Sequence, residues 1–154
     1  MRFYLAEEGH VVNALPPQDV NGGAQSDVFS LEKHSHASIV VALGATSGTP
    51  TLKVQACDDF APTNTEDLAF TYYAETDSGG DVLGSKQNAS ASGITVTSND
   101  NTFYVIEIDA AELPEGKPNL RVTLSNPGAS CLASVVAVLS GSRYAGGGDL
   151  TVLS

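Results

Sequence analysis

Basic side chains are scarce in this sequence. Seven lysines and arginines stand against eighteen aspartates and glutamates among 154 residues, which gives a formal net charge of −11 at pH 7. A protein that binds duplex DNA needs a basic footprint to displace counterions from the phosphates. The same negative charge repels an anionic lipid surface. We therefore expect neither direct nucleic-acid binding nor binding to a membrane surface.

Long apolar runs and an export signal are also missing. The longest apolar candidate, Val135–Leu139, has the length of a strand, whereas a membrane span needs roughly 18 apolar residues. Glu7 and Glu8 interrupt the opening segment before the run of about 7–15 apolar residues that a signal peptide requires. These absences predict a soluble protein that is made in a cytoplasm.

Cysteine occurs only twice, as Cys57 and Cys131. Each of them ends or interrupts an apolar run, which favours two buried free thiols; a disulfide between them is the alternative. Two isolated cysteines provide neither a CxxC motif nor a zinc-ligand framework.

Motifs for catalysis are absent, and aromatic side chains are few. The sequence contains no GxSxG, no HExxH, no glycine-rich phosphate loop and no cysteine near a histidine. Tryptophan is missing, and the aromatic residues are five tyrosines and five phenylalanines, which offers little for the aromatic platforms of a sugar-cleaving cleft. We therefore expect no enzymatic activity, no catalytic residue and no cofactor.

The sequence does contain a series of short β-branched or aromatic runs, separated by Gly, Pro, Asn, Asp and Ser. Apolar and polar residues alternate in Thr51–Cys57 and in Asn119–Ser125, which is the period of a half-buried strand. Only Ala110–Leu113 has a helical pattern, for one turn at most. The expected strands are Val28–Leu31, Ser38–Leu43, Thr51–Cys57, Ala69–Ala74, Ile94–Thr97, Thr102–Asp109, Asn119–Ser125 and Val135–Leu139.

Two of these runs, Ser38–Leu43 and Val135–Leu139, are continuously apolar. Such runs suit central strands that are covered on both faces, or strands that pack against a neighbouring subunit. About eight short strands with turn signals between them predict an all-β fold, a single antiparallel β-sandwich or jelly-roll-like domain.

Both ends of the chain depart from this pattern. We expect an extended N-terminal arm over residues 1–26, a β-sandwich over 27–143 and a C-terminal arm over 144–154. The adjacent Pro16 and Pro17 hold the chain extended and resist sheet pairing. Because both ends also carry apolar side chains, we expect each arm to dock, either on the domain's own sheet or on another subunit.

Two segments contain side chains that bind metals in other proteins. His34 and His36 share one face if their segment is extended, but zinc needs three or four ligands and the remaining histidine, His10, is distant. The loop Glu75–Asp81 carries three carboxylates and two glycines, so it can supply oxygens to calcium. We expect polar residues at a strand entrance in the first case and a solvated loop in the second, with calcium as the alternative there.

Several segments together carry a resemblance to a known family. They are the opening Leu15–Val20 with Gly22–Ala24, the strand Ser38–Leu43 followed by Gly44-Ala45 and Thr49–Ala56, the segment Phe103–Leu113, and the run Val135–Leu139 with Arg143-Tyr144. In this layout the chain resembles the head-decoration (capsid cement) proteins of tailed bacteriophages.

The resemblance implies a non-enzymatic virion protein that is assembled in the cytoplasm of a bacterial host. Such a protein binds the major capsid protein on the outer surface of the phage head, often as a homotrimer, and stabilises the shell. Arginine and tyrosine are favoured at buried contacts. The expected interface residues are Arg2, Phe3, Tyr4, Arg143 and Tyr144; ordinary packing of the terminal segments on the same domain is the alternative for these five residues.

Two other functions stay open at this point. A calcium-assisted carbohydrate- or receptor-binding β-sandwich would use the Glu75–Asp81 loop. A tail or connector subunit would instead assemble into rings or stacked tubes.

Overall fold

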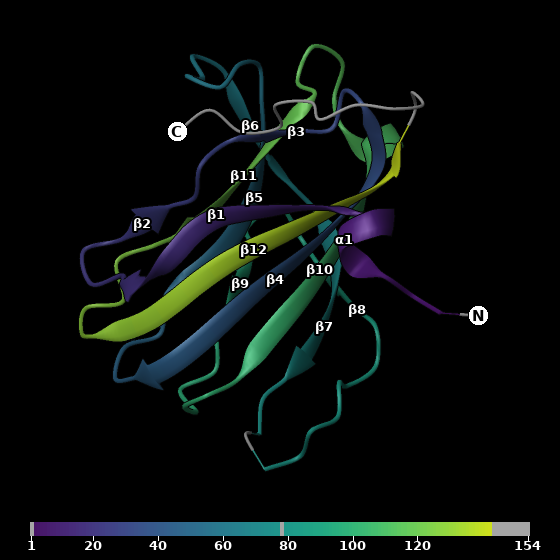
Figure 1. Cartoon of the computed structure of the whole chain (residues 1–154). Coiled ribbons are helices and arrows are strands. Elements are labelled where there is room, and N and C mark those ends of the chain that lie inside the picture. Colours follow the sequence, from purple (N-terminus) through teal and green to yellow (C-terminus); the bar gives the residue numbers. More distant parts are fainter. Residues whose placement is uncertain (1, 78, 143–154) are drawn as a thin grey trace.

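The computed structural model describes residues 2–77 and 79–142 of the chain. Two antiparallel sheets pack face to face, so the all-β sandwich expected from the sequence is confirmed (Figure 1). The strands are β1 (His10–Asp19), β2 (Ala24–Gln25), β3 (Phe29–Ser30), β4 (His34–Thr46), β5 (Thr51–Cys57), β6 (Thr65–Leu68), β7 (Phe70–Glu75), β8 (Gln87–Ala89), β9 (Ile94–Thr95), β10 (Phe103–Asp109), β11 (Asn119–Leu124) and β12 (Cys131–Ser142). The helical turns are α1 (Leu5–Glu8) and η1 (Ala110–Glu112).

The first sheet has the strand order β1-β12-β4-β10-β7-β8. Its centre consists of β12, β4 and β10, which lie side by side in Figure 1. The two continuously apolar runs fall in β12 and β4. Along both strands buried and half-buried residues alternate, so one face of each strand lies in the core and the other face points outward.

The second sheet has the order β2-β11-β5-β6, with β3 added to β11 and β9 added to β5. The inner faces of the two sheets share one hydrophobic core. Its largest fully buried side chains are Phe29, Leu31, Ile39, Leu52, Ile106, Ile108, Leu120, Leu139, Val20, Val41, Val54 and Val122.

Each of the eight expected strands corresponds to a strand of the structure, and β5 has the expected bounds. The single helical turn expected near residue 110 is η1. The sequence analysis missed β1, β2, β6, β8 and α1. Among the helices of the described residues, none is long and apolar enough to cross a membrane.

Residues 10–19 of the expected N-terminal arm form β1, an edge strand of the first sheet. This part of the arm therefore lies on the domain's own sheet, which is one of the two expected alternatives, and the expected domain boundary at residue 27 is wrong. The strand β1 pairs with β12, and its Val12, Ala14 and Leu15 are buried in the core. The prolines lie where the pairing register shifts, between Leu15 and Gln18. An edge strand with such an irregularity tolerates proline, because it does not need every backbone N–H for the sheet. The sandwich therefore begins at β1, and residues 10–25 lie on the domain's own sheets.

Asp19 fixes the end of β1 against the start of β12. Its carboxylate accepts hydrogen bonds from the backbone N–H of Cys131 at 3.0 Å, the backbone N–H of Asn21 at 3.0 Å and the hydroxyl of Ser130 at 2.9 Å. These three donors, the Cys131 N–H first, lower the pKa of Asp19. The expected C-terminal arm, residues 144–154, lies outside the described residues.

Candidate interaction surfaces

The outward face of the first sheet is apolar at its centre. Paired residues of neighbouring strands point to the same side of a sheet, and Val136, Val40, Val105 and Tyr73 are paired in this order across β12, β4, β10 and β7. All four are half-buried. No charged side chain interrupts this row. It forms the middle of a surface that we call the apolar face.

Further apolar side chains extend the apolar face on both sides of this row. Val11 pairs with Val138 in one neighbouring row, and Ala42 pairs with Phe103 in the other. Val11 and Leu132, both on outward positions, are 47% and 43% exposed. The apolar face therefore consists of Val11, Val40, Ala42, Tyr73, Phe103, Val105, Leu132, Val136 and Val138.

A histidine held between two carboxylates borders the apolar face. The Nε2 and Nδ1 atoms of His36 in β4 lie 2.6 Å from Oε2 of Glu107 and 2.6 Å from Oδ1 of Asp109, both in β10. The hydroxyl of Ser38 donates a further hydrogen bond of 2.7 Å to the same oxygen of Glu107. Two carboxylates on opposite ring nitrogens favour the imidazolium, because only this form donates from both nitrogens.

The pKa of His36 reflects two opposing effects. Partial burial lowers the pKa, but the hydrogen bonds to Asp109 and Glu107 and the charges of these two carboxylates outweigh it. The net shift raises the pKa above the ordinary histidine value of 6.5.

The rings of His34 and His36 have different partners. The ring of His34 stacks on that of His10 in the neighbouring part of the sheet, with 6.1 Å between ring centroids, whereas His36 faces β10. Throughout residues 2–77 and 79–142, no three or more His, Cys, Asp and Glu side chains are arranged to hold a metal ion.

The three carboxylates of the Glu75–Asp81 loop, for which calcium binding was the alternative, differ in their exposure to solvent. Glu75 is only 7% exposed, whereas Asp77 and Asp81 are exposed. Asp77 accepts a hydrogen bond from the backbone N–H of Gly79 at 3.1 Å. Ser78, within the same loop, lies outside the described residues.

Three of the five expected interface residues lie in the described part of the chain. Arg2, Phe3 and Tyr4 are exposed, with 73% exposure for Phe3 and 48% for Tyr4. They precede α1, which adjoins the start of β1 at one end of the first sheet (Figure 1). Arg143 and Tyr144 lie outside the described residues. Whether the five residues form an interface stays a prediction.

Cys57 and Cys131 are buried and free, which confirms the expected thiols. Burial raises the pKa of each thiol. A buried thiol with a raised pKa is a poor nucleophile at neutral pH, so both cysteines act as small core residues.

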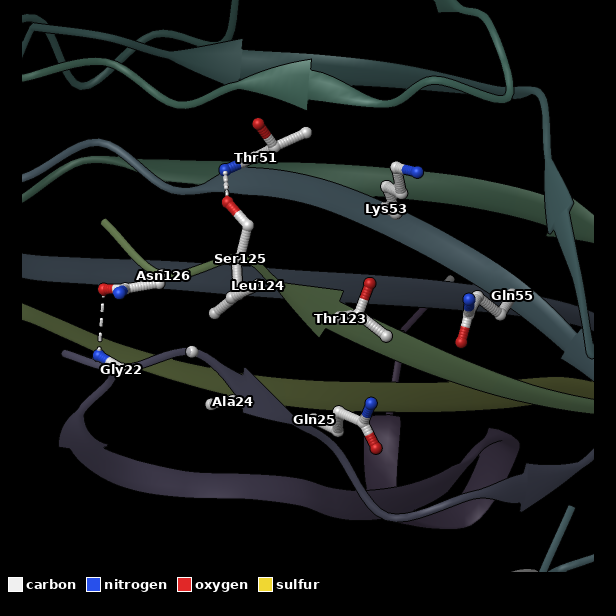
Figure 2. A pocket seen from close by; sticks show the side chains of 11 residues that line it. Gly22, Ala24, Gln25, Thr51, Lys53, Gln55, Thr123, Leu124, Ser125 and Asn126 are labelled. Carbon is white, nitrogen blue, oxygen red and sulfur yellow. Dashed lines mark hydrogen bonds between the residues drawn. The ribbon is translucent and has the colours of Figure 1, made fainter. Parts of the chain in front are cut away.

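The outward face of the second sheet is polar and contains a groove of about 700 Å³, which we call the polar groove. Figure 2 shows Gln25 of β2, Thr123 of β11, and Lys53 and Gln55 of β5 along this groove. Its end is closed by a turn in which the backbone N–H of Gly22 donates to Oδ1 of Asn126 at 3.1 Å.

A continuous set of side-chain hydrogen bonds orders one side of the polar groove. Oδ2 of Asp67 accepts from Nζ of Lys53 at 2.9 Å, and its Oδ1 accepts from Nε2 of Gln55 at 2.7 Å. Oε1 of Gln55 in turn accepts from Nε and Nη2 of Arg121 at 3.1 and 2.6 Å. The hydrogen bonds from Lys53 and Gln55 lower the pKa of Asp67.

Sequence reasoning did not identify either surface. The alternation of Thr51–Cys57 and Asn119–Ser125 correctly placed polar residues on one face of each strand. The same pattern does not tell which strands are neighbours, and the pairing of Gln55 with Arg121 joins residues 66 positions apart.

No protein-family model matches the sequence, and no curated protein is similar to it. Among solved structures, the chain is similar to the SPBc2 prophage-derived protein YomS. The two chains share 15% sequence identity, and the match covers 86% of this chain and 94% of that chain with a TM-score of 0.48.

Proposed function

We propose that this protein is a non-enzymatic virion structural protein, namely a capsid decoration protein that binds the outer surface of a phage head and stabilises it, acting as a trimer. One observation carries the proposal: the outward face of the first sheet has an uncharged, apolar central row whose side chains are partly exposed in the described structure. The resemblance of the sequence to head-decoration proteins names the partner, the major capsid protein.

The apolar face is suited to contact with another protein. An antiparallel sheet with one solvated side ordinarily carries polar residues there, whereas three valines and a tyrosine form the central row of this face. Removing such surface from water contributes roughly 25 cal/mol per Å². Because the side chains stand on paired strands, they lose little conformational freedom when they bind.

The N-terminal segment adds exposed apolar side chains next to this face. Phe3, Tyr4 and Leu5 are exposed, and they lead into β1, whose Val11 belongs to the apolar face. A Cβ atom built on Gly9 would lie 2.8 Å from Cγ1 of Val138, so the chain enters β1 over the outward side of β12. The segment and the face together can contact one partner.

A decoration protein needs no chemistry at its contact surface. A protein that binds the assembled shell and not its dissociated subunits shifts the equilibrium toward the shell. Many copies acting together make a modest contact at each site sufficient. The charge of −11 would keep the outward side of the decorated particle soluble.

Co-sedimentation with capsids tests this function. Purified protein is mixed with expanded, undecorated capsids of the cognate phage, and saturable co-sedimentation is expected. Val40→Glu, which places a charge in the centre of the apolar face, should abolish binding. Thr123→Glu, at an outward position of the second sheet, is the matched control and should bind as the unmodified protein does. Absence of saturable binding would rule out the decoration function.

The oligomeric state separates decoration from the connector alternative. Sedimentation equilibrium should give a trimer of the 154-residue chain. Rings or stacked tubes in negative-stain images would favour a tail or connector subunit instead.

A further inference from the structure

The polar groove lies on the opposite side of the sandwich from the apolar face. Its walls are side-chain amides, hydroxyls and a lysine, on strands β2, β11 and β5 (Figure 2). Across the strands, Gln25 pairs with Thr123 and Thr123 with Lys53, while Arg121 pairs with Gln55 and Gln55 with Asp67. The row of Gln25, Thr123 and Lys53 therefore lines the groove, and the parallel row of Arg121, Gln55 and Asp67 borders it through Gln55.

These side chains are ordered before any ligand arrives. Both oxygens of Asp67 and the carbonyl oxygen of Gln55 accept hydrogen bonds from neighbouring side chains. Thr123, Lys53 and Gln55 are half-buried, and Gln25 is exposed. Because hydrogen bonds already hold Lys53 and Gln55 in place, a ligand loses less affinity to the ordering of these side chains than it would on a mobile surface.

One border of the groove is locally positive in a strongly acidic protein. Lys53 lines the groove, and Arg121 and Asp67 lie beside it through their hydrogen bonds to Gln55. Lys53 and Arg121 provide two positive charges against the one negative charge of Asp67. In the part of the chain that the structure describes, no carboxylate lies within ion-pair distance of Arg121, whose partner is the neutral amide of Gln55. This arrangement favours a ligand that brings a carboxylate of its own, since a guanidinium binds a carboxylate with two parallel hydrogen bonds.

The remaining lining fits a polyhydroxylated chain better than a peptide. A peptide is recognised through an open strand edge or through pockets for its side chains, but this groove lies over the faces of β5 and β11. Among the described residues, the apolar side chains that line it are Ala24 and the buried Leu124. The amide of Gln25 and the hydroxyls of Thr51 and Thr123 are donors and acceptors for sugar hydroxyls. A volume of about 700 Å³ is within the range of ligand sites.

We propose that the polar groove binds an acidic polysaccharide. A sugar carboxylate contacts Arg121 and Lys53, and sugar hydroxyls contact Gln25, Thr51 and Thr123. This binding needs no calcium, and it holds whether or not the protein decorates a capsid, because the groove and the apolar face belong to different sheets.

Affinity electrophoresis of the full chain in gels containing polygalacturonate tests the proposal, with EDTA present and at low salt. A protein of charge −11 is repelled by a polyanion, so retardation would report a specific site. We expect clear retardation in polygalacturonate, none in neutral dextran, and weakening as salt is added. Absence of retardation in polygalacturonate, or equal retardation in dextran, would overturn the proposal.

Matched variants locate the site. Arg121→Gln should reduce affinity at least tenfold, whereas Lys86→Gln, which removes the same charge from an exposed loop outside the groove, should leave it unchanged. Thermal melting checks the fold of each variant. If Arg121→Gln does not fold, Gln25→Ala, at an exposed position with no role in the core, replaces it and should weaken retardation severalfold. Equal retardation of the groove variant and Lys86→Gln would place the binding elsewhere and refute the assignment.

Discussion

The two outward faces of this sandwich are built from strands of the same alternating pattern, yet they differ in chemistry. On the first sheet the central outward row consists of three valines and a tyrosine, and the polar side chains of His36, Ser38, Glu107 and Asp109 lie beside it. On the second sheet the outward positions carry threonine, lysine, glutamine, arginine and aspartate. The inward positions of both sheets are uniformly apolar. The core thus constrains only every second residue of each strand. The outward residues can therefore differ in polarity between the two sheets without disturbing the core.

The largest effect is expected from removing the first strand. Deleting residues 1–20 removes the buried Val12, Ala14 and Leu15 together with the whole edge strand beside β12. This should abolish cooperative unfolding in urea. Deleting only residues 1–8, none of which is buried in the described structure, should keep a single transition. A cooperative transition after the longer deletion would show that β1 is an arm after all.

Substitutions at two neighbouring residues of β4 allow a direct comparison of the inward and outward sides of the first sheet. Ile39 is fully buried and Val40 points outward. Ile39→Ala should lower the free energy of unfolding by about 2–5 kcal/mol. Val40→Ala leaves no internal cavity and should cost roughly 1 kcal/mol or less. Urea denaturation of both variants measures the difference, and equal losses would mean that the outward face is already part of a core.

The folded protein should lose stability as the pH rises through the pKa of His36, which borders the apolar face. The pKa of His36 is raised in the folded protein, so its contribution is complete below the unfolded value of 6.5 and is lost as pH increases through the folded value. Since His36 and its partners Glu107 and Asp109 are partly exposed, the loss in the free energy of unfolding should stay below about 1 kcal/mol. Melting temperatures across this range should fall less in His36→Gln than in the unmodified protein. His10→Gln is the control, and a slope unchanged in His36→Gln would contradict the assignment.

Asp67, beside the polar groove, should contribute to stability with the opposite pH dependence. The change in the free energy of unfolding expected here is the smallest of the four. The pKa of Asp67 is lowered from 3.8, so its contribution is present above that value and is lost as pH falls through the folded pKa. Asp67→Asn should cost about 0.5 kcal/mol at pH 7 and nothing at the lowest pH at which the protein stays folded. Urea denaturation at several acidic pH values checks this; a cost that is constant with pH would mean that the carboxylate charge has no role.

Local sequence patterns predicted the strands in which apolar side chains recur regularly. Thr51–Cys57 was found with its bounds because its apolar side chains recur at every second position and all face the core. The strands that were missed are edge or very short elements: β1 contains Pro16 and Pro17, while β6 (TEDL) and β8 (QNA) are polar. These segments are strands because they pair with segments that are distant in the sequence, and no local apolar periodicity predicts that pairing.

The surfaces were less predictable than the fold for the same reason. His36 was noted as a polar residue at a strand entrance, but its partners Glu107 and Asp109 are 71 and 73 positions away. The sequence suggested that β4 and β12 are either covered on both faces or packed against a neighbour. Among the described residues, the inward positions of both strands are buried and most outward positions are half-buried, so packing against a neighbour stays a prediction.

The pairing of β1 with β12 joins strands that lie far apart in the sequence, with His10 opposite Leu139. Because β12 is synthesised after the other strands of the described residues, the first sheet cannot close on β1 until the ribosome has released β12. Only then can Val11 of β1 lie beside Val138 of β12. The apolar face consequently forms late, and a nascent chain that stops before β12 does not yet carry it.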